Sequence, residues 1–252
     1  MRRAAIAFSA LLATPAWAQP VPPPQLDLPK PAPPTTTLSG EPLCAPEKLT
    51  RMVVRNISPG LPAAAPAAQP RTLYRQGALY MRSEESPDPS RGQPVVIVAE
   101  PDIWMVNLST RTGQHQVDPG PEFVVRAPVL PMTAETPPQF RSLEYGCELE
   151  FLRRNGAESP IQVVPWGEGK ATVHQVTVGE HMLSLLLTER RQAPLLVAYS
   201  RAGKGVFMMR YDEFRNDLTD RPGLFAPSKD MKITEAGPLN RPAAPTAPPP
   251  KP

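Results

Sequence analysis

Residues 171–211 read ATVHQVTVGEHMLSLLLTERRQAPLLVAYSRAGKGVFMMRY and contain four short apolar runs. Apolar and polar residues alternate along the first run, 171–178, and Gly179 precedes the second run, 182–188. The third and fourth runs flank Arg201–Gly205, a segment with two glycines that is typical of a hairpin turn. Short strands with turn signals about every ten residues predict an all-β sandwich or a barrel-like sheet.

The same pattern extends toward the start of the chain. Six further runs are predicted to form strands: 48–57, 71–76, 78–83, 94–99, 103–108 and 114–117. Trp104 and Val106 alternate with polar or smaller residues and share one face of their strand. The proline-rich stretches between the runs are predicted to be loops.

One stretch, Ser142–Arg154 (SLEYGCELEFLRR), has helical spacing. Three of its apolar residues fall on one helical face: Leu143, Cys147 and Phe151. A strand is the alternative for this segment. In either case we expect Glu148 and Glu150 on the solvated side of the element.

Two of the runs, 95–98 (VVIV) and 183–187 (LSLLL), are apolar on both strand faces. Antiparallel sheets usually expose one face to water, so such a sheet must be covered twice or must enclose a ligand. We therefore predict an apolar ligand-binding cavity, lined by Trp104, Val106, Leu183, Leu185, Phe207, Met209 and Tyr211. The alternative is that these residues fill an ordinary core.

The first 18 residues predict export. Two arginines precede an apolar run of about ten residues, and Ala16-Trp17-Ala18 supplies the small residues that a signal peptidase reads. We predict cleavage after Ala18 and a periplasmic location. An uncleaved anchor is the alternative, but spanning a bilayer takes about 20 apolar residues. Gln19 stands where a bacterial lipoprotein would need Cys, so we expect a mature chain without a lipid anchor or transmembrane segment.

Proline sets the predicted boundaries. Residues 19–43 and 237–252 are dense in proline and have few large apolar side chains, so both are predicted to be disordered tails around a domain at 44–236. The net charge of the chain limits its possible partners. The chain has 27 basic and 24 acidic residues, and cleavage would remove Arg2 and Arg3. The near balance that remains argues against nucleic-acid binding.

The two cysteines, Cys44 and Cys147, are predicted to form a disulfide, because an isolated pair in an exported chain is most simply a cross-link. Their Cα atoms should then lie about 4.4–6.8 Å apart. Two unrelated thiols are the alternative. The spacing fits neither a redox motif nor a zinc site.

Signatures of catalysis are absent from the sequence. His115, His174 and His181 stand alone, without the spacing of metal ligands, and there is no GxSxG elbow or P-loop. We expect no enzyme activity, no metal and no cofactor. A histidine within hydrogen-bond reach of Ser, Asp or Glu in a cleft would favour a hydrolase instead.

The order of segments resembles the LolA-like half-barrel superfamily. The resemblance rests on LYRQGALYMRSE (73–84), on the later run Ile103–Leu108 (IWMVNL), and on Leu224–Pro227 (LFAP) leading into a last strand. It covers about residues 46–236 and implies a strongly curved antiparallel sheet with short helices over its concave face. In that superfamily the concave side encloses an apolar cavity for acyl chains. Lipoprotein carriers use an arginine inside it, for which Arg75 and Arg82 are the candidates here.

The sequence thus predicts a mainly β, periplasmic protein that binds a lipid or another apolar ligand and handles envelope lipids or lipoproteins. Envelope proteins are expected to contact the proline-rich tails. The alternative is a non-catalytic structural or interaction protein of the cell envelope with a filled core. A cavity lined by Trp104, Leu185, Phe207 and Met209 would distinguish the two.

Overall fold

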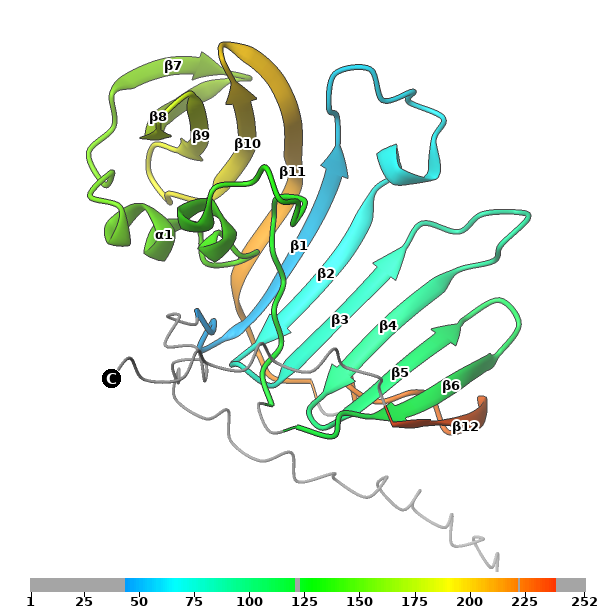
Figure 1. Cartoon of the computed structure of the whole chain (residues 1–252). Helices are drawn as coiled ribbons and strands as arrows, with labels where there is room; N and C mark the ends of the chain where they lie inside the picture. The colour runs from blue at the N-terminus through cyan, green and yellow to red at the C-terminus, as the bar shows by residue number, and fades with distance from the viewer. Residues whose placement is uncertain (1–43, 121–122, 222, 239–252) are drawn as a thin grey trace, which may run out of the picture.

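The computed structural model of the chain describes residues 44–120, 123–221 and 223–238. The predicted signal peptide, its cleavage after Ala18, the linker 19–43 and residues 239–252 of the predicted tail lie outside these residues. The first two residues of that tail, Gly237 and Pro238, belong to the last strand instead. Within the described residues, two meanders and a last strand form one 12-stranded sheet (Figure 1). The strands are β1 Leu49–Asn56, β2 Arg71–Gln76, β3 Tyr80–Glu85, β4 Pro94–Ala99, β5 Asp102–Asn107, β6 Thr112–Val117, β7 Gln162–Trp166, β8 Gly169–Val178, β9 His181–Thr188, β10 Pro194–Arg201, β11 Lys204–Leu218 and β12 Lys232–Pro238.

The two meanders, β1–β6 and β7–β11, join where β1 pairs with β11 in antiparallel orientation. The strand order is β12-β6-β5-β4-β3-β2-β1-β11-β10-β9-β8-β7, so the two end strands do not pair and the sheet stays open. Figure 1 shows that the β7–β11 part curls strongly away from the β1–β6 part. The predicted fold class, a curved half-barrel, is confirmed.

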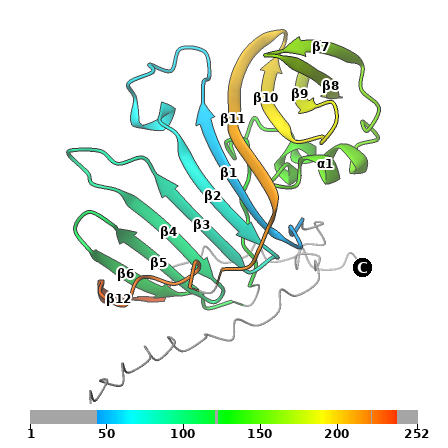
Figure 2. The same cartoon turned by 180° about the vertical axis from the view of Figure 1, so that it is seen from behind.

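Strand β11 links the two parts of the sheet. It is 15 residues long, more than twice the predicted run 206–211, because it continues through the acidic residues after Tyr211. Those charges pair with β1: Arg55 Nε lies 3.2 Å from Asp212 Oδ2. Opposite Val53 and Val54 the register shifts, which leaves one extra residue on β11. A bulge of this kind increases the bend of a strand, and β11 bends along its length (Figure 2).

Two short helical elements, η2 Pro138–Ser142 and α1 Glu148–Arg154, lie in the connection between the meanders; a third, η1 Pro66–Ala68, lies between β1 and β2. The predicted helix 142–154 is therefore shorter than expected. Gly146 interrupts it with a φ of 82°, in the left-handed region. Leu143, Cys147 and Phe151 are all buried as predicted, although only the last lies in α1.

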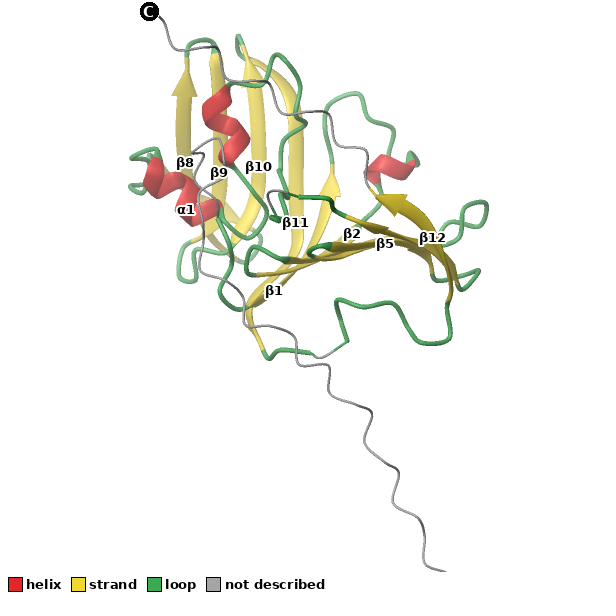
Figure 3. Ribbon diagram, turned by 60° about the horizontal axis from the view of Figure 1, so that its bottom comes forward, coloured by secondary structure: helices red, strands yellow, loops and turns green. Residues whose placement is uncertain are grey.

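We call the face that packs on α1 and residues 123–147 the inner face. It carries the main hydrophobic core, in which β1, β2 and β8–β11 contact η2, α1 and the segment around Val129 (Figure 3). Aromatic contacts contribute: the rings of Phe140 and Tyr199 meet edge to face, with their centroids 6.0 Å apart.

The opposite, outer face of β3–β5 has a second core. Tyr80, Val95, Ile97 and Val106 pack there against Phe225. Phe225 belongs to the segment between β11 and β12, which crosses the outer face (Figure 2). Because the chain returns in this way, β12 pairs with β6 in parallel, while every other pairing of the described strands is antiparallel.

Candidate functional site

A cavity of about 390 Å³ opens on the inner face, where β1, β2 and β11 meet the segment 128–131. Its size lies within the range of pockets that hold small ligands, about 300–1,000 Å³. Its wall is mainly apolar and includes Val54, Pro70, Val129, Leu130, Phe207 and Met209. The cavity can therefore bury a hydrocarbon group.

Charged side chains stand at one side of this cavity. Arg71 lies opposite Glu85 in the pairing of β2 with β3, but Glu85 Oε2 lies 3.7 Å from Arg91 Nη1 instead. Arg91 also lies 4.0 Å from a carboxylate oxygen of Asp88. Among the residues that the structure describes, no carboxylate forms an ion pair with Arg71. The cavity therefore has one cation that no acid neutralises by contact.

Tyr145 lines the same cavity. It belongs to residues 123–147, which pack on the inner face and which we call the covering segment. The side chain is buried. Its hydroxyl makes no hydrogen bond of regular geometry among the described residues, although the Arg71 guanidinium lies close enough to act on it as a hydrogen-bond donor. Burial raises the pKa of Tyr145 to about 12, against the opposing effect of the nearby Arg71 guanidinium. The hydroxyl is therefore protonated at neutral pH and can donate a hydrogen bond.

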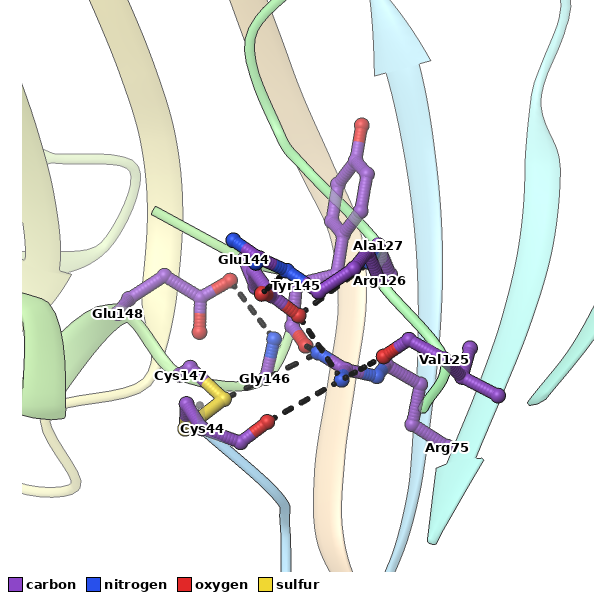
Figure 4. Close-up of polar contacts among 10 residues, drawn as sticks. All are labelled: Cys44, Arg75, Val125, Arg126, Ala127, Glu144, Tyr145, Gly146, Cys147 and Glu148. Atoms are coloured by element: carbon purple, nitrogen blue, oxygen red, sulfur yellow. Dashed lines mark hydrogen bonds and ion pairs between the residues drawn. A yellow bond between two sulfur atoms is a disulfide. The ribbon is translucent and has the colours of Figure 1, made fainter. Parts of the chain in front are cut away.

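Arg75, four residues after Arg71 in the sequence, holds the covering segment onto β2 (Figure 4). Its guanidinium is fully buried and lies 3.1 Å from Glu144 Oε2, and it donates to the backbone oxygens of Tyr145 (2.6 Å) and Cys44 (3.3 Å). Burial lowers the pKa of Arg75, and Glu144 opposes that effect. Figure 4 shows the Tyr145 ring pointing away from this group of polar contacts.

Neither candidate for a cavity arginine lines the cavity. Arg75 is enclosed by the covering segment, and Arg82 donates to Glu84 (2.6 Å) and to the backbone oxygen of Leu224 (3.0 Å). The arginines that line the cavity are Arg91, which pairs with Glu85, and Arg71. Arg71 shares the inner strand face with Arg75, so the alternation along β2 was the sequence signal for it.

The expectation that Glu148 is solvated is wrong. The carboxyl is buried and accepts hydrogen bonds from the Tyr211 hydroxyl (2.6 Å) and the Gly146 backbone N–H (3.0 Å). Burial raises the pKa of Glu148, although these two hydrogen bonds oppose the rise. Burial and the nearby Glu148 also raise the pKa of Tyr211 well above its ordinary value. Glu150, in contrast, is partly exposed, as expected.

The disulfide between Cys44 and Cys147 is confirmed, with a Cα–Cα distance of 5.9 Å. It joins the residues before β1 to the start of α1. Arg75 Nη1 lies 3.9 Å from Cys147 Sγ (Figure 4). The cross-link and the buried ion pair therefore hold the covering segment at the same place.

The seven residues predicted to line one cavity lie in three settings. Phe207 and Met209 line the cavity of about 390 Å³. Leu183 and Leu185 are fully buried in the main core, to which Tyr211 also belongs, with its hydroxyl bonded to Glu148. Trp104 and Val106 belong to the outer core instead. The cavity residues that sequence reasoning missed, such as Leu130 and Tyr145, lie outside the strands, where no periodicity marks them.

The three histidines lie away from this cavity. His115 bridges Asp102 (2.8 Å) and Glu235 (2.7 Å) where β12 joins the sheet. His174 contacts the backbone oxygen of Ala157, and His181 the Tyr199 hydroxyl. His174 lines a separate cavity of about 460 Å³ beside α1. The described ranges contain no group of three or more His, Cys, Asp or Glu that could hold a metal ion.

The described residues thus define a half-barrel with a partly polar cavity on its inner face. No protein-family model matches the chain, and no curated protein matches its sequence. Solved structures with a similar fold include an uncharacterized conserved protein from Thermus thermophilus, at 12% identity and a TM-score of 0.42, covering 75% of this chain and 91% of that one.

MucB in complex with MucA(peri) is 10% identical over 75% of this chain, with a TM-score of 0.41. The chain spans 57% of that MucB chain's length. A LolA superfamily protein from Nitrosomonas europaea is 10% identical, with a TM-score of 0.31, over 73% of this chain and 92% of that one. Likeness at this level carries no argument about function. Among the described residues, no helix combines the length and the apolar character needed to cross a membrane.

Proposed function

We propose that the protein is a non-enzymatic, periplasmic binding protein that holds a lipid or another apolar ligand in the cavity of its inner face, in the handling of envelope lipids or lipoproteins. The observation that carries the proposal is the cavity of about 390 Å³ with its wall of Val54, Phe207 and Met209. The predicted signal peptide and the disulfide support a location outside the cytoplasm, because cytoplasmic thiols are kept reduced.

Native mass spectrometry of protein extracted gently from its own compartment tests this proposal. We expect a fraction of the protein to carry a co-purified lipid mass. Ala67 is an exposed residue at the cavity, so Ala67→Trp should block the cavity and remove that mass without disturbing the core. Ala64 is exposed in the same loop but does not line the cavity, so Ala64→Trp is the matched control and should keep the lipid.

The proposal is wrong if wild-type protein has a clean apo mass and also fails to take up added fatty acid. That outcome would favour the second candidate, an envelope interaction protein with a filled core whose proline-rich tails contact its partners. The observation in favour of this candidate is that Leu183, Leu185 and Leu187 are fully buried, so the inner face of β9 is filled by protein.

A further inference from the structure

The polar groups at the cavity are unevenly satisfied. The two carboxylates that line the cavity both have partners. Glu85 pairs with Arg91 (3.7 Å), and Asp88 accepts a hydrogen bond from the backbone N–H of Ser90 (2.8 Å). Arg71 has no such carboxylate within the part of the chain that the structure describes. The carboxylates of Glu85 and Asp88 therefore contact their own neighbours, while the Arg71 guanidinium has N–H donors that contact no carboxylate among the described residues.

The second unsatisfied group is the Tyr145 hydroxyl. It is buried, lines the same cavity and makes no hydrogen bond of regular geometry among the described residues, and the nearby Arg71 guanidinium can act only as a donor to its oxygen. Leaving a buried hydroxyl unpaired costs free energy, which an incoming acceptor recovers. Arg71 can only donate, and the Tyr145 hydroxyl beside it keeps a proton to donate, so the missing group is an acceptor. Hydrogen bonds of this kind are strongest when the acceptor is an anion.

Building on the proposed function, we propose that the cavity takes an anionic single-chain amphiphile. Its carboxylate or phosphate headgroup accepts hydrogen bonds from Arg71 and Tyr145, and its hydrocarbon chain lies along Val54, Phe207 and Met209. A cationic headgroup would be repelled by the Arg71 guanidinium, and a neutral hydroxyl would gain hydrogen bonds without the attraction between opposite charges. The site therefore selects among apolar ligands by their headgroup.

The first test keeps the protein unchanged and varies the ligand. Binding of laurate, monododecyl phosphate, dodecanol and dodecyltrimethylammonium is measured by calorimetry, with inorganic phosphate as the headgroup alone. We expect the two anions to bind at least about tenfold more tightly than dodecanol, as charge-assisted hydrogen bonds allow. Affinity should rise about fourfold for each methylene added to a shorter chain, until the cavity is full.

The second test varies the protein. Arg71→Gln and Tyr145→Phe should each weaken laurate binding by about tenfold and dodecanol binding by much less. Arg55→Gln is the control, because Arg55 is paired with Asp212 and lies outside the cavity. Tyr145→Phe removes a hydroxyl that makes no hydrogen bond of regular geometry, so it should keep or raise the Tm of ligand-free protein. A purely structural role for that hydroxyl predicts the opposite change in Tm.

The outcomes separate this inference from the proposed function. If no amphiphile binds, the proposed function itself fails. If laurate and dodecanol bind equally and neither variant changes this, the apolar cavity stands and the headgroup inference is overturned. If inorganic phosphate alone binds with the same dependence on Arg71, and chain length has no effect, the site is one for a free anion and the amphiphile is excluded.

Discussion

The inner face of the sheet is filled in the β7–β11 half, whereas in the β1–β6 half the described residues bury β1 and β2 but leave β4 and β5 exposed, although the same sheet forms both. In the β7–β11 half, Leu185 is fully buried under the connection that contains η2 and α1. In the β1–β6 half, Val96 and Met105 of the same face are 36% and 43% exposed. Cross-strand neighbours form one continuous row from core to solvent: Met52, Leu73, Ser83, Val96, Met105 and Gln114.

This difference in exposure shows where a ligand can reach the inner face. The described part of the connection from β6 to β7 covers the strands from β8 to β2, and among the described residues Val96 of β4 and Met105 of β5 stay exposed on this face. The cavity lies at the boundary, where Phe207 and Met209 mark the end of the core and Arg71 and Tyr145 begin the polar wall. The cavity has both apolar and polar walls because the covering segment ends there.

The largest expected effect comes from removing the link between the covering segment and the sheet. The disulfide closes a loop with a sequence separation of 103 residues, for which the chain-entropy model gives about 4.7 kcal/mol. We expect the double variant Cys44→Ala, Cys147→Ala to lose a large part of this in urea unfolding, and reducing agent to lower the Tm of wild type. An unchanged Tm on reduction would show that the cross-link does not stabilise the fold.

A pair of truncations tests the comparison itself. Leu185→Ala removes a fully buried side chain from the filled half and should lower the unfolding free energy by about 3 kcal/mol. Met105→Ala, on the open half of the same face, should change it by less than about 0.5 kcal/mol. Chemical denaturation measures both values. Equal losses would mean that something covers Met105 in solution and that the open half is not open.

The smallest expected effect concerns β12, the edge strand of the open half. Burial lowers the pKa of His115, but its hydrogen bonds to Asp102 and Glu235 outweigh this and raise the pKa above the ordinary value. The charged ring therefore stabilises the fold fully below about pH 6.5, and this contribution is lost as the pH rises through the raised pKa.

Glu235→Gln should accordingly cost at most about 1 kcal/mol near pH 5.5 and almost nothing near pH 8, because exposed ion pairs are weak. Glu189→Gln, an exposed glutamate of the other half, is the control. Unfolding at the two pH values and an NMR titration of His115 provide the measurements. A larger cost at pH 8 than at pH 5.5 would contradict the direction of the pKa shift.

Much of the sheet was predictable because strand alternation is a local property. The runs 71–76 and 94–99 coincide with β2 and β4. Strand β7 was missed because Pro165 interrupts a short run, and proline is tolerated in sheets mainly on edge strands such as this one. The second half of β11 was missed because its charges pair with β1 and so disguise the alternation.

The candidate site was predictable only in part. Phe207 and Leu185 look alike in the sequence, since both are apolar residues on alternating strands. Both belong to the main core, but only Phe207 also lines the cavity, because the segment 128–131 and the helical connection cover them differently. We expected Glu148 in solvent because no neighbouring residue in the sequence indicates its partner, the Tyr211 hydroxyl.

The sequence by itself determined a mainly β sheet of hairpins and the pairing of Cys44 with Cys147, because turn residues, alternation and a lone pair of cysteines act through rules that need few distant partners. The curvature of this sheet was predicted only through the resemblance to the half-barrel superfamily. Only the tertiary structure decided where the inner face is filled, which side chains line the cavity, and that Arg75 is buried against Glu144. Those two residues are 69 positions apart. Burial, ion pairing and cavity walls depend on which distant segments meet, and the connection across the inner face sets that arrangement.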